Sequence, residues 1–401
     1  MKKAVINTMV NRYIGAGQAA VIMAALGVFG LIISDFTDTG AMLSNAVSAV
    51  ILIALALIPP VILIKDGSGS VPQIAVMRTG FIGRLISVLY SIFFISAAAD
   101  FIAKYSVFVS ERYFEASAAV CAVFLGVICG YISHTGAETV SRMSTVLIFM
   151  LILTGAAYVI SGFGDIISYD YAKIVPETIS LSGGLGGIFP VAAAGAAALC
   201  ILSGGLGKRT RAGVFGGAAA MLIALSLVII GVWAVLDDFV FSSDYPMADA
   251  VIYASRRMSF RPDGAFFMLW TIIAAAVSSL MCACAGHSLT AAVPKFRWWG
   301  ILTAALALIG AEAELWGISV GSIYRSPVCA FILVGAIPLA LIFIPEKGGK
   351  QGEKAILRSR STVHGADHDL VQRSPGKRKN VRSAHGHIGN GRTVRADRSG
   401  I

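Results

Sequence analysis

Residues 212–236 read AGVFGGAAAMLIALSLVIIGVWAVL, an apolar run that contains no charged residue. A bilayer core about 30 Å thick requires about 20 apolar residues per helix, and this run is longer than that. Lipid offers backbone N–H and C=O groups no partner, so a segment of this kind has to form a helix. A second uncharged run covers residues 42–64, and similar stretches follow one another from Ile14 to Pro345. The sequence therefore predicts an all-α, polytopic membrane protein.

We expect about ten transmembrane helices separated by short polar loops. Their predicted ranges are 14–33, 42–64, 85–103, 116–133, 143–162, 187–206, 213–235, 264–286, 298–313 and 326–344. Two loops are interpreted as helices at the membrane surface, Val71–Arg84 and the segment Met247–Met258 that follows Pro246. With the N-terminus inside, the cytoplasmic segments before the tail carry twelve Lys and Arg and the outer segments carry seven. The positive-inside rule then favours both termini in the cytoplasm of a multi-pass protein of the cell membrane.

Composition supports this class and divides the chain in two. Hydrophobic residues make up 57% and charged residues 13%, whereas soluble domains carry about 25% charged residues. Residues 346–401 hold 13 of the 32 Lys and Arg and 5 of the 22 Asp and Glu. We therefore predict a membrane domain over 1–345 and a disordered basic cytoplasmic tail over 346–401, which either contacts anionic lipid or is functionally idle. The tail lacks Phe, Tyr and Trp to stack on bases, so no nucleic-acid partner is predicted.

The sequence contains no pattern that predicts an enzyme, a cofactor or a metal site. All six cysteines fall inside apolar segments, without the spacing of metal ligands, and are interpreted as packing residues. The glycine-rich stretch 183–187 lacks the Lys and Ser/Thr of a phosphate-binding loop. A non-enzymatic membrane role follows.

Ten helices with both ends inside can form two five-helix halves of opposite topology, in which the first helix of each half is broken at the ligand site. The first span contains Gly27-Val28-Phe29-Gly30, and the sixth contains Pro190 and Gly195. A break exposes backbone groups that can hold a charged ligand. The predicted substrate-binding residues are Gly27, Val28, Phe29, Gly30, Ala194 and Gly195. The alternative is that these glycines only allow close helix packing.

Few polar groups lie at membrane depth. Ser278 and Ser279 in the eighth span could help to hold a cation opposite the break in the first span, although the sequence favours the alternative that they are packing hydroxyls. Asp100 and Lys104 are one helical turn apart and are predicted to pair, in a structural or a gating role.

A capping box is predicted where the fifth span begins. Thr135 is its expected N-cap, Glu138 stands at the third helical position, and Arg142 follows one turn later. We interpret this segment as structural anchoring.

The same segment resembles a known family. Tyr131, Gly136, Glu138 and Arg142 match the Y-x-x-x-x-G-x-E-x-x-x-R pattern of the spore germination permeases, the B subunits of germinant receptors. Further landmarks stand in the same order along residues 10–345: Gln18, Gly27–Gly30, Gly80–Gly83, Pro176, Tyr245-Pro246 and Trp270. The chain departs from the pattern at Ala41–Leu43, where an aromatic residue is common, and in its long tail.

The resemblance implies a branch of the amino acid–polyamine–organocation transporters with a 5+5 inverted repeat. It implies a small germinant, commonly an amino acid, bound between broken helices 1 and 6 with help from helices 3 and 8. It also implies partner subunits and the inner membrane of a spore. The alternative functions are a stand-alone secondary transporter of amino acids or similar solutes, and a membrane scaffold that acts through its tail.

Overall fold

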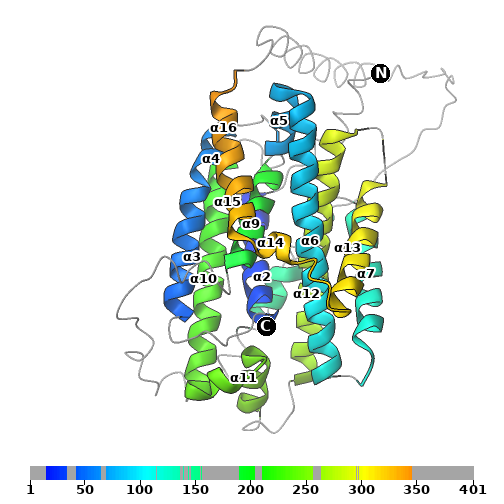
Figure 1. Ribbon diagram of the computed structural model, residues 1–401. Helices are drawn as coiled ribbons and strands as arrows, with labels where there is room; N and C mark the ends of the chain where they lie inside the picture. Colours follow the sequence, from blue (N-terminus) through cyan, green and yellow to red (C-terminus); the bar gives the residue numbers. More distant parts are fainter. Residues whose placement is uncertain are drawn as a thin grey trace, which may run out of the picture. The chain divides into compact units, whose positions relative to one another are not determined.

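The computed structural model describes residues 15–33, 42–64, 69–113, 115–135, 139, 143, 146–153, 155, 189–203, 210–255, 263–294, 296 and 298–345 (Figure 1). Regular secondary structure in these ranges is helical throughout, with no strand. The all-α prediction is therefore confirmed. The predicted tail, 346–401, lies outside the described residues.

Each predicted span except 143–162 has a full helical counterpart. The first nine elements of this set are α2 (Ala16–Ile33), α3 (Met42–Ala56), α4 (Ile58–Leu63), α6 (Phe81–Arg112), α7 (Ala118–Thr135), α9 (Phe189–Leu202), α10 (Thr210–Leu236), α12 (Asp263–Ala292) and α13 (Trp299–Leu315). The last predicted span, 326–344, is built from α15 (Pro327–Phe331), η6 (Ile332–Ala336) and α16 (Ile337–Phe343), and the short helix α14 (Ser322–Arg325) precedes it. Of the span 143–162, residues 143, 146–153 and 155 are described and are helical.

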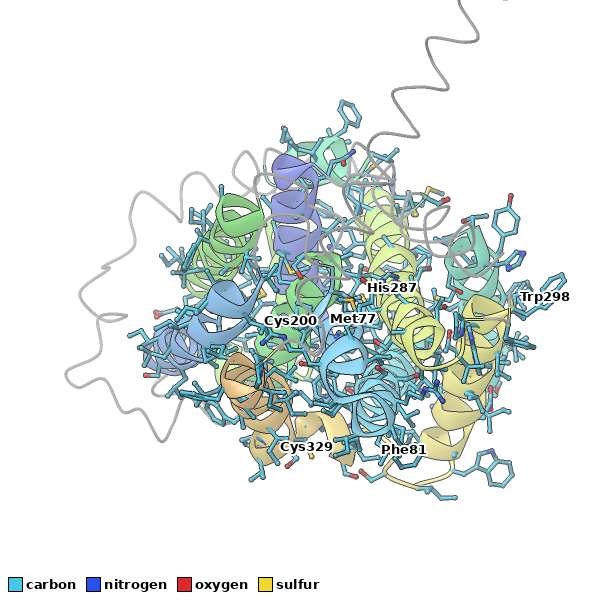
Figure 2. The ribbon with its side chains drawn as sticks, turned by 90° about the horizontal axis from the view of Figure 1, so that it is seen from above. Met77, Phe81, Cys200, His287, Trp298 and Cys329 are labelled. Carbon is cyan, nitrogen blue, oxygen red and sulfur yellow. The ribbon has the colours of Figure 1, made fainter. Side chains whose placement is uncertain are left out.

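The outer surface of the helices is apolar. Among the described helices, Phe81–Arg112, Ala118–Thr135, Ala212–Leu236 and Gly264–Ala292 are long and apolar enough to cross a bilayer. Large apolar side chains point outward from three of them: Phe81 is 71% exposed, Phe124 69% and Leu227 65%. Figure 2 shows Phe81 at the periphery of the bundle. Apolar surface on this scale suits a lipid environment, and the chain is a polytopic membrane protein.

Prolines divide the second predicted span. Pro59 and Pro60 have no N–H and therefore cannot bond to carbonyls one turn earlier. α3 accordingly ends at Ala56, and α4 begins at Ile58 with proline in its first turn.

A proline also explains the π-helical segment η6 of the last span. Pro338 cannot donate to the carbonyl of Leu333, the i→i+5 partner that the π-helical pattern assigns to it. The Tyr90 hydroxyl on α6 donates to that carbonyl instead. The contact ties α6 to the last span and satisfies a buried acceptor.

Two short helices mark the ends of the bundle. α5 (Val71–Thr79) stops at Gly80, whose φ of +64° lets the chain turn into α6, so the surface helix predicted over Val71–Arg84 is shorter than expected. Its Val71, Ile74 and Ala75 are buried. α11 (Pro246–Ser255) lies at the opposite end (Figure 1). We call these the α5 end and the α11 end.

α2 and α9 form the centre of the bundle. Every residue of α9 is buried, and α2 is buried from Ala25 to Ile32. α10 packs along α2, and α6, α9 and α12 also contact it. α2 therefore contacts each of the other three helices that the sequence resemblance associates with a ligand, α6, α9 and α12.

Candidate ligand-binding site

The expected break in the first span is not present in this structure. α2 continues as a helix through Gly27–Gly30. A Cβ on Gly27 would lie 3.2 Å from Met221 of α10, and one on Gly30 would lie 2.6 Å from Val191 of α9. These neighbours are apolar, so an unwound backbone would leave its polar groups unpaired at a cost of several kcal/mol each. The alternative drawn from the sequence, close packing at glycine, describes this segment.

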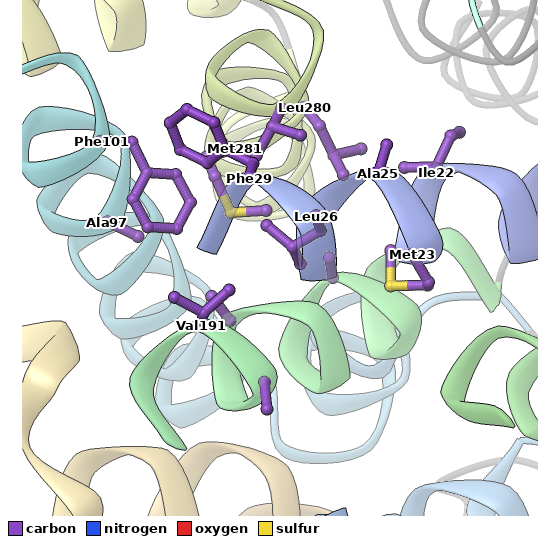
Figure 3. Packing of buried hydrophobic residues seen from close by; sticks show 14 of the residues in the cluster. Ile22, Met23, Ala25, Leu26, Phe29, Ala97, Phe101, Val191, Leu280 and Met281 are labelled. Carbon is purple, nitrogen blue, oxygen red and sulfur yellow. The ribbon is translucent and has the colours of Figure 1, made fainter. Parts of the chain in front are cut away.

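The sixth span is also continuous where it is described. Pro190 stands in the first turn of α9, where its missing N–H interrupts no helical bond. Ala194 and Gly195 are buried, and a Cβ on Gly195 would lie 2.9 Å from Leu26 of α2. Figure 3 shows Leu26 on α2 facing α9. The glycine therefore brings the two central helices together.

Aromatic side chains from α2, α6 and α12 meet beside this contact. We call Phe29, Phe101, Tyr105, Phe108 and Trp270 the aromatic cluster. The Phe29 ring lies 5.2 Å from that of Phe101 and 6.1 Å from that of Tyr105, and the rings of Phe108 and Trp270 lie 5.9 Å apart (Figure 3 for the first pair). Such edge-on and tilted pairs are favourable and rigid. Among the substrate-binding residues predicted from the sequence, Phe29 thus belongs to the aromatic cluster, where its ring contacts Phe101 and Tyr105.

Two buried donors on α12 lack a partner among the described residues. They are Trp270 Nε1 and Ser278 Oγ, and both side chains are fully buried. By contrast, Tyr105 Oη lies 2.8 Å from Thr271 Oγ1. An unpaired buried donor costs about 1–3 kcal/mol, so each is a position where a ligand acceptor would be stabilising.

The two serines of the predicted cation site differ. Ser279 Oγ donates to the carbonyl of Ala275 on its own helix at 2.5 Å. Ser278 Oγ has no partner among the described residues, and Ser279 Oγ keeps its oxygen lone pairs when it donates its proton, so the cation site stays a prediction. Within the described ranges, no group of three His, Cys, Asp or Glu could hold a metal ion.

Asp100 belongs to a larger network than the sequence indicated. Its side chain is fully buried and lies 3.8 Å from Lys104 Nζ. The Tyr324 hydroxyl donates to Asp100 Oδ2 at 2.7 Å, and Arg325 forms an ion pair with Asp100. Arg325 also lies 2.6 Å from Glu314 Oε1. We call these five residues the Asp100 network; it joins α6, α13 and α14.

The remaining predicted residues are placed only in part. Glu138 and Arg142 lie outside the described residues. Thr135, the expected N-cap, ends α7 and donates its hydroxyl to the carbonyl of Ile132 at 2.6 Å. Sequence reasoning missed Tyr324 and Arg325 as partners of Asp100, because more than 200 residues separate them in the chain.

Comparison with solved structures identifies the fold. Mhp1, a nucleobase-cation-symport-1 family transporter solved in a closed conformation with bromovinylhydantoin bound, superposes with a TM-score of 0.53 and 13% identity over 81% of this chain and 78% of that one. The chain has the fold of that transporter. A manganese transporter of Eremococcus coleocola matches with a TM-score of 0.46 and 11% identity over 84% and 77% of the two chains. The sequence matches no family model and no curated protein.

Proposed function

We propose that this protein is a membrane permease-like subunit that binds a small ligand between α2, α6, α9 and α12. The observation that carries the proposal is Trp270 Nε1, a buried donor with no partner among the described residues, placed in the aromatic cluster on the central helices. Ligand sites are mostly apolar and contain a few polar groups that fix orientation. A ligand with an acceptor group, such as a carboxylate, suits this site.

The ligand is proposed to be an amino acid, and the protein to be a subunit of a spore germinant receptor. The support is the sequence resemblance, which includes Trp270 among its landmarks, together with a fold that a small-molecule transporter also adopts. Partner subunits and the inner membrane of a spore belong to the same proposal. Both termini are proposed to be cytoplasmic.

Ligand access would require the central helices to separate. α2 and α9 touch at Gly30 and Gly195, so a ligand at the predicted backbone site would have to part this contact. We propose that Ser278 and the predicted backbone site contribute in that opened state. The Asp100 network is proposed to hold α6, α13 and α14 together in the closed state, because it joins helices from different parts of the chain.

The second candidate function is a stand-alone secondary transporter of amino acids or similar solutes. The fold comparison supports it, since Mhp1, whose fold this chain shares, is a transporter. No catalytic role is proposed. The two candidates share a fold and a site, so they differ only in whether the ligand crosses the membrane.

A binding and uptake experiment tests both candidates. Full-length protein in lipid nanodiscs is heated with each of the twenty amino acids. A ligand at 100 times its Kd should stabilise the protein by about 2.7 kcal/mol. The amino acid that stabilises it is then offered in radiolabelled form to proteoliposomes. Binding without uptake supports the receptor subunit, and uptake supports the transporter. If no amino acid stabilises the protein, the proposed ligand class is wrong.

A further inference from the structure

His287 is an isolated ionisable residue in an apolar helix. α12 contains no Lys, Arg or Glu, and its one Asp stands at the first position. His287 lies near the last residue of α12 and is partly buried, so protons can reach it. In Figure 2, which looks down on the α5 end, His287 lies toward the middle of the bundle, whereas Phe81 and Trp298 lie near its edge. Ionisable side chains at membrane depth are costly and are therefore candidates for function.

The start of α5 contacts this histidine. Gln73 Nε2 and Ser70 Oγ each lie 3.4 Å from His287 Nε2. Ser70 precedes α5, and Gln73 stands at the third helical position of a capping box. The Ser70 N–H donates to Gln73 Oε1 at 3.0 Å. The helix cap and the contact with α12 therefore share one side chain.

This arrangement fixes the direction of the hydrogen bond. Gln73 Oε1 accepts from the backbone, so its amide nitrogen faces the histidine. An amide nitrogen carries only donors, so His287 Nε2 has to accept. A histidine nitrogen accepts only when it is unprotonated, which places the proton of the neutral ring on Nδ1. The contact as observed requires neutral His287.

The surrounding charges also oppose protonation. The titratable groups described on this end of α5, α6, α7, α9 and α12 are Arg78, Arg84, Tyr90, Cys129, Tyr131, His134, Cys200, Cys282 and Cys284, and the described parts of α2 and α13 that also pack on α12 add none at this end. This set contains no carboxylate that could stabilise an imidazolium. Arg78 donates to the carbonyls of Leu341 and Ile344 at the end of α16, which keeps its guanidinium at this end of the bundle.

We propose that His287 is a proton-binding site that controls the docking of α5 on α12. Neutral His287 accepts from Gln73 and holds α5. A proton arriving from solvent bonds to Nε2 and places an N–H against the Gln73 amide, where donor faces donor. The Gln73 contact is then lost, only Ser70 Oγ can still accept from the ring, and α5 is held less firmly on α12. Docking is present above the titration of His287 and is lost as the pH falls through it. The proposal that His287 binds a proton rests on these contacts alone. If the docking of α5 also controls access of a ligand to the bundle, that role rests on the proposed permease function.

Hydrogen exchange of the full chain in nanodiscs tests the site without any ligand. Exchange is compared at about pH 8 and about pH 4, with rates corrected for intrinsic chemistry; the range extends well below an ordinary histidine titration, because the surroundings of His287 oppose its protonation. In the wild type, amides of Val71–Thr79 should exchange about tenfold faster at the lower pH, because local opening becomes easier. Amides of α11 serve as the internal reference.

Three variants sharpen the test. His287→Gln offers a neutral acceptor that does not titrate, so α5 should stay protected at both pH values. Gln73→Glu keeps the acceptor for Ser70 but places a carboxylate against His287, so docking should become stronger at low pH and the dependence should reverse. His134→Gln, whose parent ring stacks on Trp298, is the matched control and should behave as wild type.

Equal protection of wild-type α5 at both pH values would overturn the proposal. An undiminished pH dependence in His287→Gln would overturn it as well, as would an unchanged direction in Gln73→Glu. If one variant fails to fold, the wild-type series and the other variant still decide. These hydrogen-exchange measurements involve no ligand. A failure of the amino-acid binding experiment is therefore distinguishable from a failure of this proposal.

Discussion

The two ends of the bundle are held by different kinds of contact. At the α11 end, charged side chains pair across helices: Arg112 lies 3.2 Å from Asp249 of α11. Farther from that end along α6, Asp100 pairs with Arg325. At the α5 end, α5 is held by buried apolar side chains and by hydrogen bonds, including those from Gln73 to His287 and from Arg78 to backbone carbonyls. Exposed ion pairs weaken with salt, whereas a hydrogen bond to a neutral histidine is lost on protonation. The two ends should therefore respond to different conditions.

The largest loss of unfolding free energy is expected from Arg325→Ala. Asp100 would remain fully buried with Tyr324 and Lys104 but without its guanidinium partner. Leaving a buried charge uncompensated typically costs about 3–5 kcal/mol of unfolding free energy. Because Arg325 is partly exposed, we expect a loss of about 3 kcal/mol. Thermal unfolding in detergent measures it. Arg325→Gln combined with Asp100→Asn should recover much of the loss, and equal instability of single and double variants would contradict the charge argument.

Tyr90→Phe tests a contact that depends on geometry rather than charge. The variant removes the donor to the Leu333 carbonyl, which Pro338 cannot replace. An orphaned buried acceptor costs about 1–3 kcal/mol of unfolding free energy. Tyr131→Phe, on a side chain that is 74% exposed, is the matched control and should change little. The same small change in both variants would show that the π-helical segment does not need Tyr90.

Arg112→Ala should have the smallest effect. Its pair with Asp249 is partly exposed, and such pairs contribute about 0.2–1 kcal/mol. Hydrogen exchange of α11 should rise slightly in low salt and should match wild type in high salt, where the pair is screened. A difference that persists at high salt would mean that the Arg112 contact with the Tyr245 ring, 5.4 Å from its centroid, matters more than the charge.

The sequence predicted the helices better than their contacts. Runs such as 212–236 have one stable form in lipid, so length and composition sufficed for the spans. The division at Pro59 and the π-helical segment before Pro338 also have causes visible in the sequence, because proline removes a donor. The form of Gly27–Gly30 was not predictable, since glycine permits both an unwound helix and the close packing seen against Val191.

The site was predictable only in outline. Phe29 and Asp100 stand at contacts between helices, yet nothing near Asp100 in the sequence indicated Tyr324 or Arg325. Their pairing with Asp100 depends on how α14 packs against α6. His287 was visible as a lone histidine in an apolar run, but its partner Gln73 lies 214 residues away. Such contacts are set by tertiary structure rather than by local pattern.

Trp270→Phe tests the ligand site most directly. The variant keeps an aromatic ring but removes the buried donor, which has no partner among the described residues. Without ligand, Tm should stay the same or rise, because an unpaired donor is lost. The Kd of the amino acid found in the binding screen should weaken about tenfold, the equivalent of one hydrogen bond of about 1.4 kcal/mol. Trp316→Phe, on a side chain that is 84% exposed, is the control. An unchanged Kd in Trp270→Phe would contradict a ligand site at this position.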